Sequence, residues 1–213
     1  MSNKIRNLFI HIKNAWDCWK ERQHLVYTDF SIISNNCWGG TIYQKFGLKY
    51  TTPTVGLFIM DEDYIKFLEN LQFYLTKELV FIQPCQSKYY NYLTAERHRE
   101  ITYPIARLGD IEIFFMHYHS EKEAKEKWQR RISRINYKRL LVKMSLRNSN
   151  SVEILQRFEQ LPYKNKICFT ALNFSGRDII QCPELTTLNI QGGDETSYTL
   201  QQIDIYNLLN NIK

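Results

Sequence analysis

Hydrophobic residues near the start of the chain recur at the spacing of one face of an α-helix. Six apolar positions follow the i, i+3, i+4, i+7 pattern: Ile5, Leu8, Phe9, Ile12, Trp16 and Trp19. Lysine and arginine residues lie mostly off this stripe. This pattern therefore predicts an amphipathic helix within residues 1–23 that begins near residue 3. Such a helix packs against the rest of the protein or lies on a membrane surface, and its two tryptophans and basic polar face keep the second alternative open.

Downstream, short apolar runs alternate with segments of helical periodicity. The expected strands are residues 30–33, 52–59, 79–82, 111–119, 140–144 and 167–172, with a candidate edge strand near 185–190. The expected helices are residues 41–46, 61–75, 121–137 and 151–161, and a last helix that begins with a capping box at Thr199 and Gln202. This alternation predicts a single α/β domain over residues 1–213, with a mostly parallel or mixed sheet and helices on both faces.

Residues 84–103 interrupt this alternation with a polar segment rich in tyrosine. It contains a charged cluster at residues 96–100, which we expect to be solvated. A segment of this length predicts either a functional flap or an insertion that contains a helix. Its tyrosine rings can stack on sugar or base rings.

Length and charge narrow the classes of partner. The chain has 213 residues, which suits one core, since single cores grow to roughly 250–300 residues before chains divide. Its 28 Lys and Arg residues outnumber 22 Asp and Glu residues, for a formal net charge of +6. This excess fits a phosphate-bearing partner or an anionic membrane surface. Nucleic acid is not the favoured partner, because the sequence contains no recognisable binding module or dense basic tract.

The cysteines indicate the compartment. Their number, five, is odd, their spacing is wide, and no C-x-x-C pair occurs. This pattern argues for reduced thiols in a cytoplasm, and against a disulfide framework or a cysteine-based zinc site. No apolar run approaches the roughly 20 residues of a spanning helix, and charged residues interrupt the first 23 positions, unlike a signal peptide. We expect a cytoplasmic protein, with contact to the inner face of the membrane through residues 1–23 left open.

The segment from Ser34 to Gly40, Ser-Asn-Asn-Cys-Trp-Gly-Gly, is the strongest candidate site. It lies between an expected strand and an expected helix, where α/β proteins place ligands. Asn35 and Asn36 offer hydrogen-bond donors and acceptors, while Gly39 and Gly40 let the backbone approach a ligand and present amides to an oxyanion or phosphate. The alternative is a tight turn in which the asparagines cap the helix.

Cys37 is the candidate nucleophile. Exposed N–H groups at a helix N-terminus would stabilise its thiolate and lower its pKa. The alternative is a buried structural thiol, since cysteine is among the most buried residue types. A nucleophilic cysteine needs a base, and His117 is the best candidate, with Glu112 to orient it. On a regular strand His117 shares a face with His119 and not with Glu112, so this arrangement requires a bulge or bend.

Two further pairs of side chains can act in chemistry. Asp110 and Glu112 can serve as a carboxylate pair, or hold a divalent cation near a sugar-nucleotide diphosphate. His117 and His119 can bind a transition metal from one strand face, but a site needs a further ligand and none occurs at a characteristic spacing. We therefore predict no metal site. No classical nucleotide fingerprint occurs, so the sequence identifies no cofactor.

Arg131 is the most informative cation in the expected helix 121–137. At about 100° per residue it falls within roughly 60° of Trp128, at the edge of the buried stripe, with Arg134 farther round. A partly buried guanidinium can bind a carboxylate or phosphate bidentately. The alternative is an internal ion pair with Asp110 or Glu112, because a charge near a core edge must be paired.

Four groups of residues carry a family resemblance. They are Ser34 to Gly40, Pro-Thr-Val-Gly-Leu-Phe at 53–58, Tyr-Pro-Ile at 103–105 followed by Asp-Ile-Glu at 110–112, and His-Tyr at 117–118 followed by Trp128, Arg131, Arg134, Ile135 and Asn136. Together they resemble an uncharacterised bacterial domain family whose members are often labelled exopolysaccharide-biosynthesis proteins. The resemblance covers nearly the whole chain, and it implies a pathway more than a chemistry.

Three functions follow from these residues. In a cytoplasmic glycosyl or acyl transferase of exopolysaccharide biosynthesis, a phosphate-bearing donor would lie on residues 35–40 beside Asp110, Glu112, His117 and Arg131. In a Cys/His hydrolase or transferase, Cys37 would be the nucleophile. In a protein that binds a glycan or nucleotide without turnover, Trp38 and Arg131 would hold the ligand.

Overall fold

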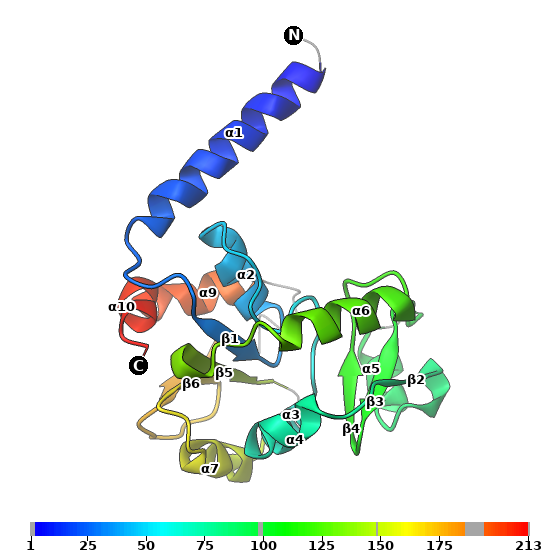
Figure 1. Ribbon diagram of the computed structural model, residues 1–213. Helices are drawn as coiled ribbons and strands as arrows, with labels where there is room; N and C mark the ends of the chain where they lie inside the picture. The colour runs from blue at the N-terminus through cyan, green and yellow to red at the C-terminus, as the bar shows by residue number, and fades with distance from the viewer. Residues whose placement is uncertain (1–2, 98–99, 148, 186–193, 213) are drawn as a thin grey trace.

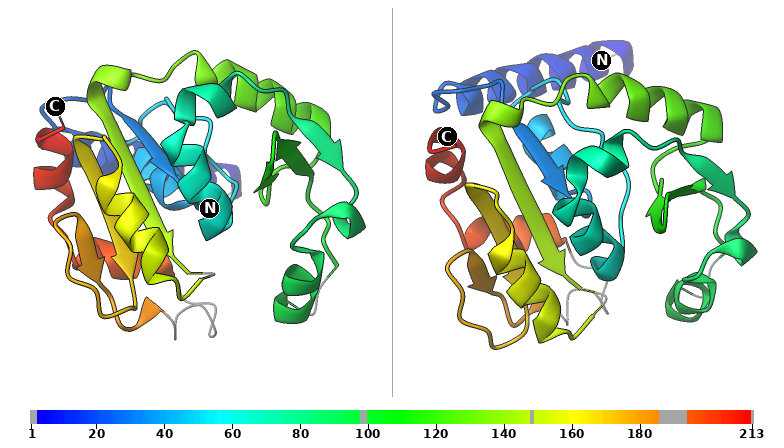
Figure 2. Two further views of the ribbon diagram at one scale, coloured as in Figure 1. Left: turned by 90° about the horizontal axis from the view of Figure 1, so that it is seen from below. Right: turned by 60° about the horizontal axis from the view of Figure 1, so that its bottom comes forward.

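A four-stranded parallel sheet forms the centre of the protein in the computed structural model, which describes residues 3–97, 100–147, 149–185 and 194–212. Its strands, in spatial order, are β1 (Ser31–Ser34), β5 (Leu140–Leu146), β6 (Asn165–Thr170) and β7 (Ile179–Gln181). Ile32 lies opposite Leu141, and Met144 lies opposite Cys168. Figure 2 shows these strands side by side. β1 and β5 are buried along their whole length, as expected for parallel strands that are covered on both faces.

Helices pack on both faces of this sheet. The helices in the described part of the whole chain, not all of which touch the sheet, are α1 (Asn3–Arg22), α2 (Trp38–Lys45), α3 (Asp61–Glu69), α4 (Leu71–Leu75), α5 (Tyr90–Arg97), α6 (Glu121–Ile132), α7 (Val152–Gln160), α9 (Glu195–Gln201) and α10 (Ile205–Asn210), with 3-10 turns η1 (Pro84–Gln86) and η2 (Tyr137–Arg139). Ile33 and Val142 pack with α3 and α7, whereas Ile32 and Leu141 pack with α2 and α10. Because successive strand residues point to opposite faces, each strand contributes to both cores. The predicted α/β fold is confirmed.

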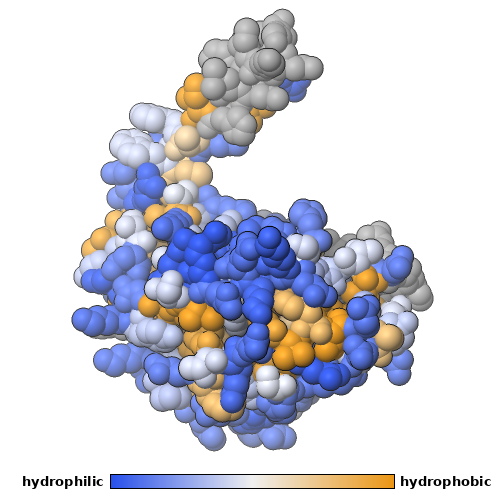
Figure 3. Space-filling view, turned by 45° about the vertical axis from the view of Figure 1, so that its right-hand side comes forward, coloured by the Kyte–Doolittle hydropathy of each residue, from blue (hydrophilic) through white to orange (hydrophobic). Residues whose placement is uncertain are grey.

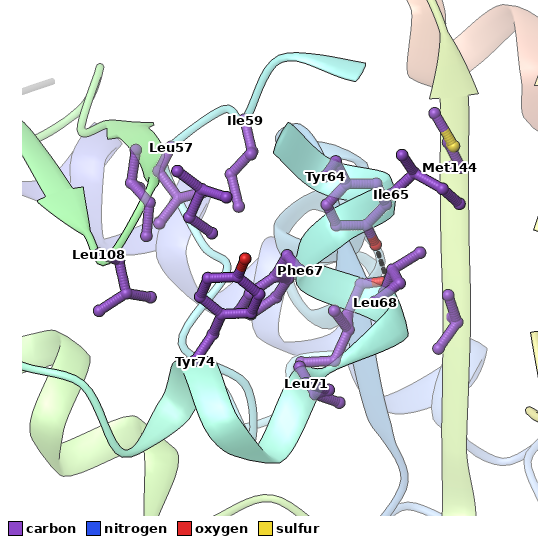
Figure 4. Packing of buried hydrophobic residues seen from close by; sticks show 14 of the residues in the cluster. Leu57, Ile59, Tyr64, Ile65, Phe67, Leu68, Leu71, Tyr74, Leu108 and Met144 are labelled. Carbon is purple, nitrogen blue, oxygen red and sulfur yellow. Dashed lines mark hydrogen bonds between the residues drawn. The ribbon is translucent and has the colours of Figure 1, made fainter. Parts of the chain in front are cut away.

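A small antiparallel sheet lies to one side of the parallel sheet (Figures 1 and 2). It consists of β2 (Val80–Ile82), β3 (Ile105–Leu108) and β4 (Ile111–Phe114). Gly109, at φ 67°, makes the tight turn between β3 and β4, a conformation that favours glycine. α3 packs between the two sheets: Figure 4 shows its side chains reaching from Leu57 and Leu108 to Met144 of β5. The Tyr64 hydroxyl lies 2.9 Å from the Ile33 and Lys143 carbonyl oxygens, which ties α3 to β1 and β5.

Two expected strands are shorter than their sequence pattern predicts. Of residues 52–59, only Phe58 makes a β-bridge, to Phe114, because Gly56 adopts φ 71° and turns the chain. The expected strand at 111–119 ends at Phe114, since the Tyr118 N–H donates to the Phe115 carbonyl oxygen in a turn. His117 and His119 therefore do not lie on one strand face.

Helix boundaries also differ from the predicted ones. The expected helix 61–75 is divided at Asn70, whose φ of −134° is not helical, and the helix from residue 121 ends at Ile132. Asp194 and Asp204 cap α9 and α10, so the predicted capping box at Thr199 is wrong. The Thr199 hydroxyl instead donates to the Glu195 carbonyl oxygen inside α9.

Two predicted segments, residues 96–100 and 185–190, lie partly outside the residues that the structure describes. The segment 84–103 contains η1 and α5, but most of the charged cluster at 96–100 lies outside the described side chains. The candidate edge strand at 185–190 lies outside the described residues apart from Leu185, and β7 is the strand at this edge. No helix among the described residues combines the length and apolar character needed to cross a bilayer.

A buried ion pair joins the parallel sheet to α9 and to the turn before α2. The Lys143 ammonium, fully buried on β5, donates to Glu195 Oε1 (2.9 Å), Ser145 Oγ (2.5 Å) and Asn36 Oδ1 (3.1 Å). Glu195 also accepts from Arg147 Nη1 at 2.8 Å and from the Ser145 hydroxyl. We call these five residues the Lys143–Glu195 network. Burial by itself raises the pKa of Glu195, but the charges of Lys143 and Arg147 and the hydrogen bonds outweigh burial and lower this pKa to about 2.

Removing one member of the buried pair should destabilise the protein strongly. Lys143→Met leaves Glu195 buried with fewer partners, so we expect the free energy of unfolding to fall by about 3–5 kcal/mol. The double variant Lys143→Met/Glu195→Gln should lose less than the sum of the two single changes, because neither charge is left unpaired. Lys125→Met, which breaks the surface pair with Glu78, is the control and should change stability by less than about 1 kcal/mol. Urea unfolding of the wild type and of these four variants measures the differences, and strict additivity would contradict the prediction.

The same network predicts a pH dependence of stability. A carboxylate whose pKa is lower in the folded than in the unfolded protein stabilises the fold above its unfolded pKa, and this stabilisation is lost as the pH falls through the folded pKa. For Glu195 the two values are 4.5 and about 2. The stability difference between wild type and Glu195→Gln should therefore be largest above about pH 5 and shrink steadily at lower pH. Urea unfolding at a series of pH values tests this, and a constant difference would be the opposite result.

Candidate functional site

A cavity of about 430 Å³ lies between α2 and α6. Its lining comes from α2, from the loop that follows it, from the turn after β4 and from α6: Cys37, Gly40, Thr41, Gln44, Tyr50, Val55, Gly56, His117, Tyr118, Lys127 and Arg131. Four predicted site residues thus meet at one cavity, although they come from segments far apart in the sequence: Cys37, Gly40, His117 and Arg131. The volume falls in the range of about 300–1,000 Å³ that small-molecule sites occupy. We call this the α2–α6 cavity.

Cys37 borders the α2–α6 cavity as the residue before the first turn of α2. Its side chain is half-buried. Burial, followed by the negative charge of Glu195, raises the pKa of the Cys37 thiol, and the charges of Lys143 and Arg147 offset only part of this effect. The predicted lowering of this pKa by helix N–H groups is therefore wrong. At neutral pH the thiol is protonated, which makes it a poor nucleophile.

The N–H groups expected to face a ligand are used inside the protein. The Trp38 N–H donates to Asn36 Oδ1 at 3.2 Å, and the Gly39 N–H donates to Ser34 Oγ at 3.3 Å. A Cβ atom on Gly39 would lie 2.9 Å from Ser34 Oγ, so this glycine lets α2 approach β1 and not a ligand. Gly40, in contrast, lines the α2–α6 cavity.

The remaining residues of this turn hold the fold together. Asn35 is buried and pairs with β5 through its side chain, accepting from the Ser145 N–H (3.0 Å) and donating to the Ser145 carbonyl oxygen (2.8 Å). Asn36 binds both carboxylate oxygens of Glu195 within the Lys143–Glu195 network. Trp38 is buried, and its Nε1–H donates to Thr199 Oγ1 at 3.0 Å. None of these three lines the α2–α6 cavity.

His117 lies at the mouth of the α2–α6 cavity, where its side chain is exposed. Its backbone N–H donates to the Gly56 carbonyl oxygen at 3.0 Å. A Cβ atom on Gly56 would lie 3.2 Å from the Cβ atom of His117, and the backbone at φ 71° favours glycine in any case. Gly56 thus allows the loop and the turn after β4 to meet at this wall.

Asp110 and Glu112 are not at the α2–α6 cavity. Glu112 is buried and accepts hydrogen bonds from Ser87 Oγ (2.5 Å) and the Lys88 N–H (3.2 Å). Asp110 is exposed and accepts from Tyr74 Oη (2.7 Å). The predicted roles of Glu112 as the partner of His117, and of both carboxylates beside a donor, therefore lack the required geometry, because each is committed to other side chains.

Arg131 is the central charge of the α2–α6 cavity. Only 6% of its surface is exposed. Nη1 donates to the Tyr118 hydroxyl at 2.6 Å, and the guanidinium carbon lies 5.0 Å from the centre of the Tyr50 ring. No ion pair formed by the described residues includes Arg131, so the alternative of a pair with Asp110 or Glu112 is not observed.

Tyr118 fixes the position of this guanidinium without neutralising it. Its hydroxyl donates to the Val55 carbonyl oxygen at 2.6 Å and accepts from Arg131. Burial raises the pKa of Tyr118 despite the opposing charge of Arg131, so the phenol stays neutral at physiological pH. A neutral hydroxyl satisfies one N–H group and leaves the positive charge uncompensated.

Two further cations of α6 differ in their relation to the α2–α6 cavity. Lys127 lines it and pairs with Glu123 at 2.5 Å, so its charge is compensated. Arg134 is half-buried, donates to the Tyr50 carbonyl oxygen at 3.5 Å and is not among the lining residues. Within the described part of the chain, no three His, Cys, Asp or Glu side chains lie close enough to hold a metal ion.

Several residues of the site carried no detectable signal in the sequence. Tyr50 and Lys127 line the α2–α6 cavity, but an isolated tyrosine or lysine is common in any chain. Tyr118 belongs to a segment that carries the family resemblance, but its role beside Arg131 was not predicted. Lys143 and Glu195 lie 52 residues apart, and neither belongs to a motif. The one available clue was a lysine inside an otherwise apolar strand, since a buried lysine requires a partner.

Comparison with known proteins places the chain in a family. An uncharacterized protein of Haemophilus influenzae (strain ATCC 51907 / DSM 11121 / KW20 / Rd) is 38% identical over 149 residues, which cover 70% of this chain and 65%, slightly under two thirds, of that relative. A family described as a domain of unknown function, DUF1919, matches residues 5–210. The resemblance to an uncharacterised bacterial family is confirmed at this level. The chain belongs to the DUF1919 family.

Proposed function

We propose that this protein binds a phosphate-bearing small molecule in the α2–α6 cavity, and that Arg131 holds the phosphate. The observation that carries the proposal is the buried guanidinium of Arg131, which has a neutral partner in Tyr118 and no carboxylate among its described partners. A buried charge without a counter-charge costs several kcal/mol. An anionic ligand would supply the counter-charge, and a phosphate would match the planar donor geometry of arginine.

The surroundings of Arg131 favour an organic phosphate over a bare ion. The α2–α6 cavity, at about 430 Å³, is larger than a phosphate group needs. Tyr50 and Val55 provide apolar surface beside the guanidinium, while Gln44 and Thr41 provide hydrogen-bonding side chains. This combination of apolar walls with a few placed polar groups is typical of small-molecule sites.

The resemblance to exopolysaccharide-biosynthesis proteins suggests which organic phosphates to consider. Glycosyl transferases take nucleotide sugars, and acyl transferases take acyl-CoA, and both donors carry phosphate. We propose that such a donor occupies the α2–α6 cavity and that the protein transfers its glycosyl or acyl group. In this proposal His117, exposed at the mouth of the cavity, is the side chain placed to accept a proton from the attacking acceptor.

Replacing Arg131 should abolish the rise in Tm that a donor molecule causes. A ligand that binds only the folded state, at a concentration of 100 times its Kd, raises the free energy of unfolding by about 2.7 kcal/mol. For a chain of this size, that increase corresponds to a rise in Tm of roughly 5–10 °C. We expect UDP-glucose or acetyl-CoA to produce such a rise in wild type, and neither to produce it in Arg131→Met. Without ligand, Arg131→Met should be as stable as wild type or more stable, because the change removes a desolvated charge.

Arg130→Met is the matched control. Arg130 precedes Arg131 on α6, is exposed, and does not line the α2–α6 cavity, so this variant loses the same charge and should keep the full shift in Tm. Equal shifts in both variants, or no shift with either donor in wild type, would count against the proposal. A shift without release of UDP or free CoA in the presence of glycan acceptors would favour the binding protein without turnover.

A second candidate function is covalent chemistry at Cys37, since Cys37 and His117 line the same cavity. The raised pKa of the thiol opposes it. We therefore expect iodoacetamide at neutral pH to label the exposed Cys85 before Cys37, while the buried Cys168 stays unlabelled in the folded protein. Mass spectrometry of the digested protein gives the order. Labelling of Cys37 ahead of Cys85 would instead support the nucleophile.

A further inference from the structure

The first helix leaves large apolar side chains in solvent. Figure 1 shows α1 projecting away from the rest of the protein, and Figure 3 shows hydrophobic side chains along it. The exposed fractions are 57% for Ile12, 54% for Trp16 and 43% for Trp19. These three positions belong to the apolar stripe, whose other members, Ile5, Leu8 and Phe9, have side chains outside the described part. An apolar stripe this exposed marks an interaction surface.

The attachment of α1 lies near its C-terminal end. The Cys18 thiol donates to the Gln44 carbonyl oxygen at 3.3 Å, and Arg22 Nη1 donates to the Gly47 carbonyl oxygen at 3.2 Å. Glu21 pairs with Lys45 at 2.5 Å. At about 100° per residue, Cys18 and Glu21 lie roughly 130° and 170° from the middle of the stripe, and Arg22 lies roughly 90° from it. These contacts hold the helix while Ile12, Trp16 and Trp19 stay exposed. All three partners lie on or beside α2, which also lines the α2–α6 cavity.

Basic residues border the apolar stripe. α1 contains five basic residues and two acidic ones, a net charge of +3: Lys4, Arg6, Lys13, Lys20 and Arg22 against Asp17 and Glu21. At about 100° per residue, Lys20 lies roughly 40° and Lys13 roughly 60° from Trp16, on the same border of the stripe. The Lys20 ammonium lies 5.4 Å from the centre of the Trp16 ring, which stacks on Trp19 with ring centres 4.9 Å apart.

We propose that α1 docks on the surface of an anionic phospholipid bilayer. In this arrangement the helix lies in the plane of the interface, Ile12, Trp16 and Trp19 enter the boundary between headgroups and acyl chains, and Lys13 and Lys20 reach the lipid phosphates. Tryptophan suits this depth because its ring is apolar and its N–H is polar. The charge argues against a second copy of α1 as the occupant, since two helices of net charge +3 would repel each other.

Vesicle sedimentation with the full chain tests the contribution of charge. Vesicles of equimolar phosphatidylglycerol and phosphatidylcholine should sediment the wild type, and vesicles of phosphatidylcholine alone should bind it much more weakly. Lys13→Gln/Lys20→Gln should weaken binding to the anionic vesicles by roughly 25-fold, about fivefold for each cation. Lys138→Gln/Lys164→Gln, which changes the net charge equally at two exposed lysines outside α1, should bind like wild type.

A second pair of variants tests the apolar stripe. Trp16→Ser/Trp19→Ser should abolish sedimentation with the anionic vesicles. Phe73→Ser is the matched control, because Phe73 is equally exposed at 53% and also lies under a lysine, Lys77, but belongs to α4. This control should sediment with the anionic vesicles as the wild type does.

Tryptophan fluorescence locates the contact. The chain has four tryptophans, of which Trp38 and Trp128 are each 1% exposed, so quenching by acrylamide reports mainly on Trp16 and Trp19. Anionic vesicles should protect these two from acrylamide. Binding that ignores lipid charge, or that survives loss of both tryptophans, would overturn the proposal. A concentration-dependent dimer in sedimentation velocity that the tryptophan changes abolish, without vesicle binding, would assign the stripe to a second copy and overturn it as well.

Discussion

The buried ion pair of Lys143 and Glu195 is the constraint on which the arrangement of this protein depends. Lys143 cannot leave the interior, because it lies in the middle of the long strand β5. Its charge therefore requires a carboxylate, and Glu195 at the start of α9 provides it at 2.9 Å. Asn36 binds both members of the pair, so the turn that leads from β1 into α2 is fixed by the same interaction. The position and the protonation of Cys37 follow from this turn.

Two cations that are buried in the described part of the chain, Lys143 and Arg131, differ in the partners that surround their charges. Lys143 is surrounded by acceptors and a carboxylate, so its charge is satisfied without any other molecule. Arg131 is also buried, with 6% of its surface exposed against 0% for Lys143, but its described partners are a neutral hydroxyl and an aromatic ring. The proposed ligand binding rests on this difference, because an anion in the open cavity would supply the counter-charge that Arg131 lacks among the described residues.

The architecture could be predicted from the sequence because it follows from local periodicity. The alternation of buried strands and amphipathic helices gave the parallel sheet and the helices on both faces, and the helical spacing placed Arg131 at the buried edge of α6. Element ends were less predictable: Gly56 and the turn after Phe114 shortened two strands through tertiary contacts that no local pattern reveals. Of the side chains expected at one site, Cys37, His117 and Arg131 line one cavity, whereas Glu112 and Asp110 lie elsewhere. The state of the thiol was not predictable, because burial and, after it, the charge of Glu195, distant in sequence, raise the pKa of Cys37.

The long connection between β1 and β5 has a consequence for how this family can diversify. These neighbouring strands are separated by 105 residues between Ser34 and Leu140, and this stretch supplies every lining residue of the α2–α6 cavity. The four strands of the parallel sheet contribute none of them. Substitutions at these lining positions can therefore change the shape and charge of the cavity without altering the strands of the parallel sheet or the pair of Lys143 and Glu195.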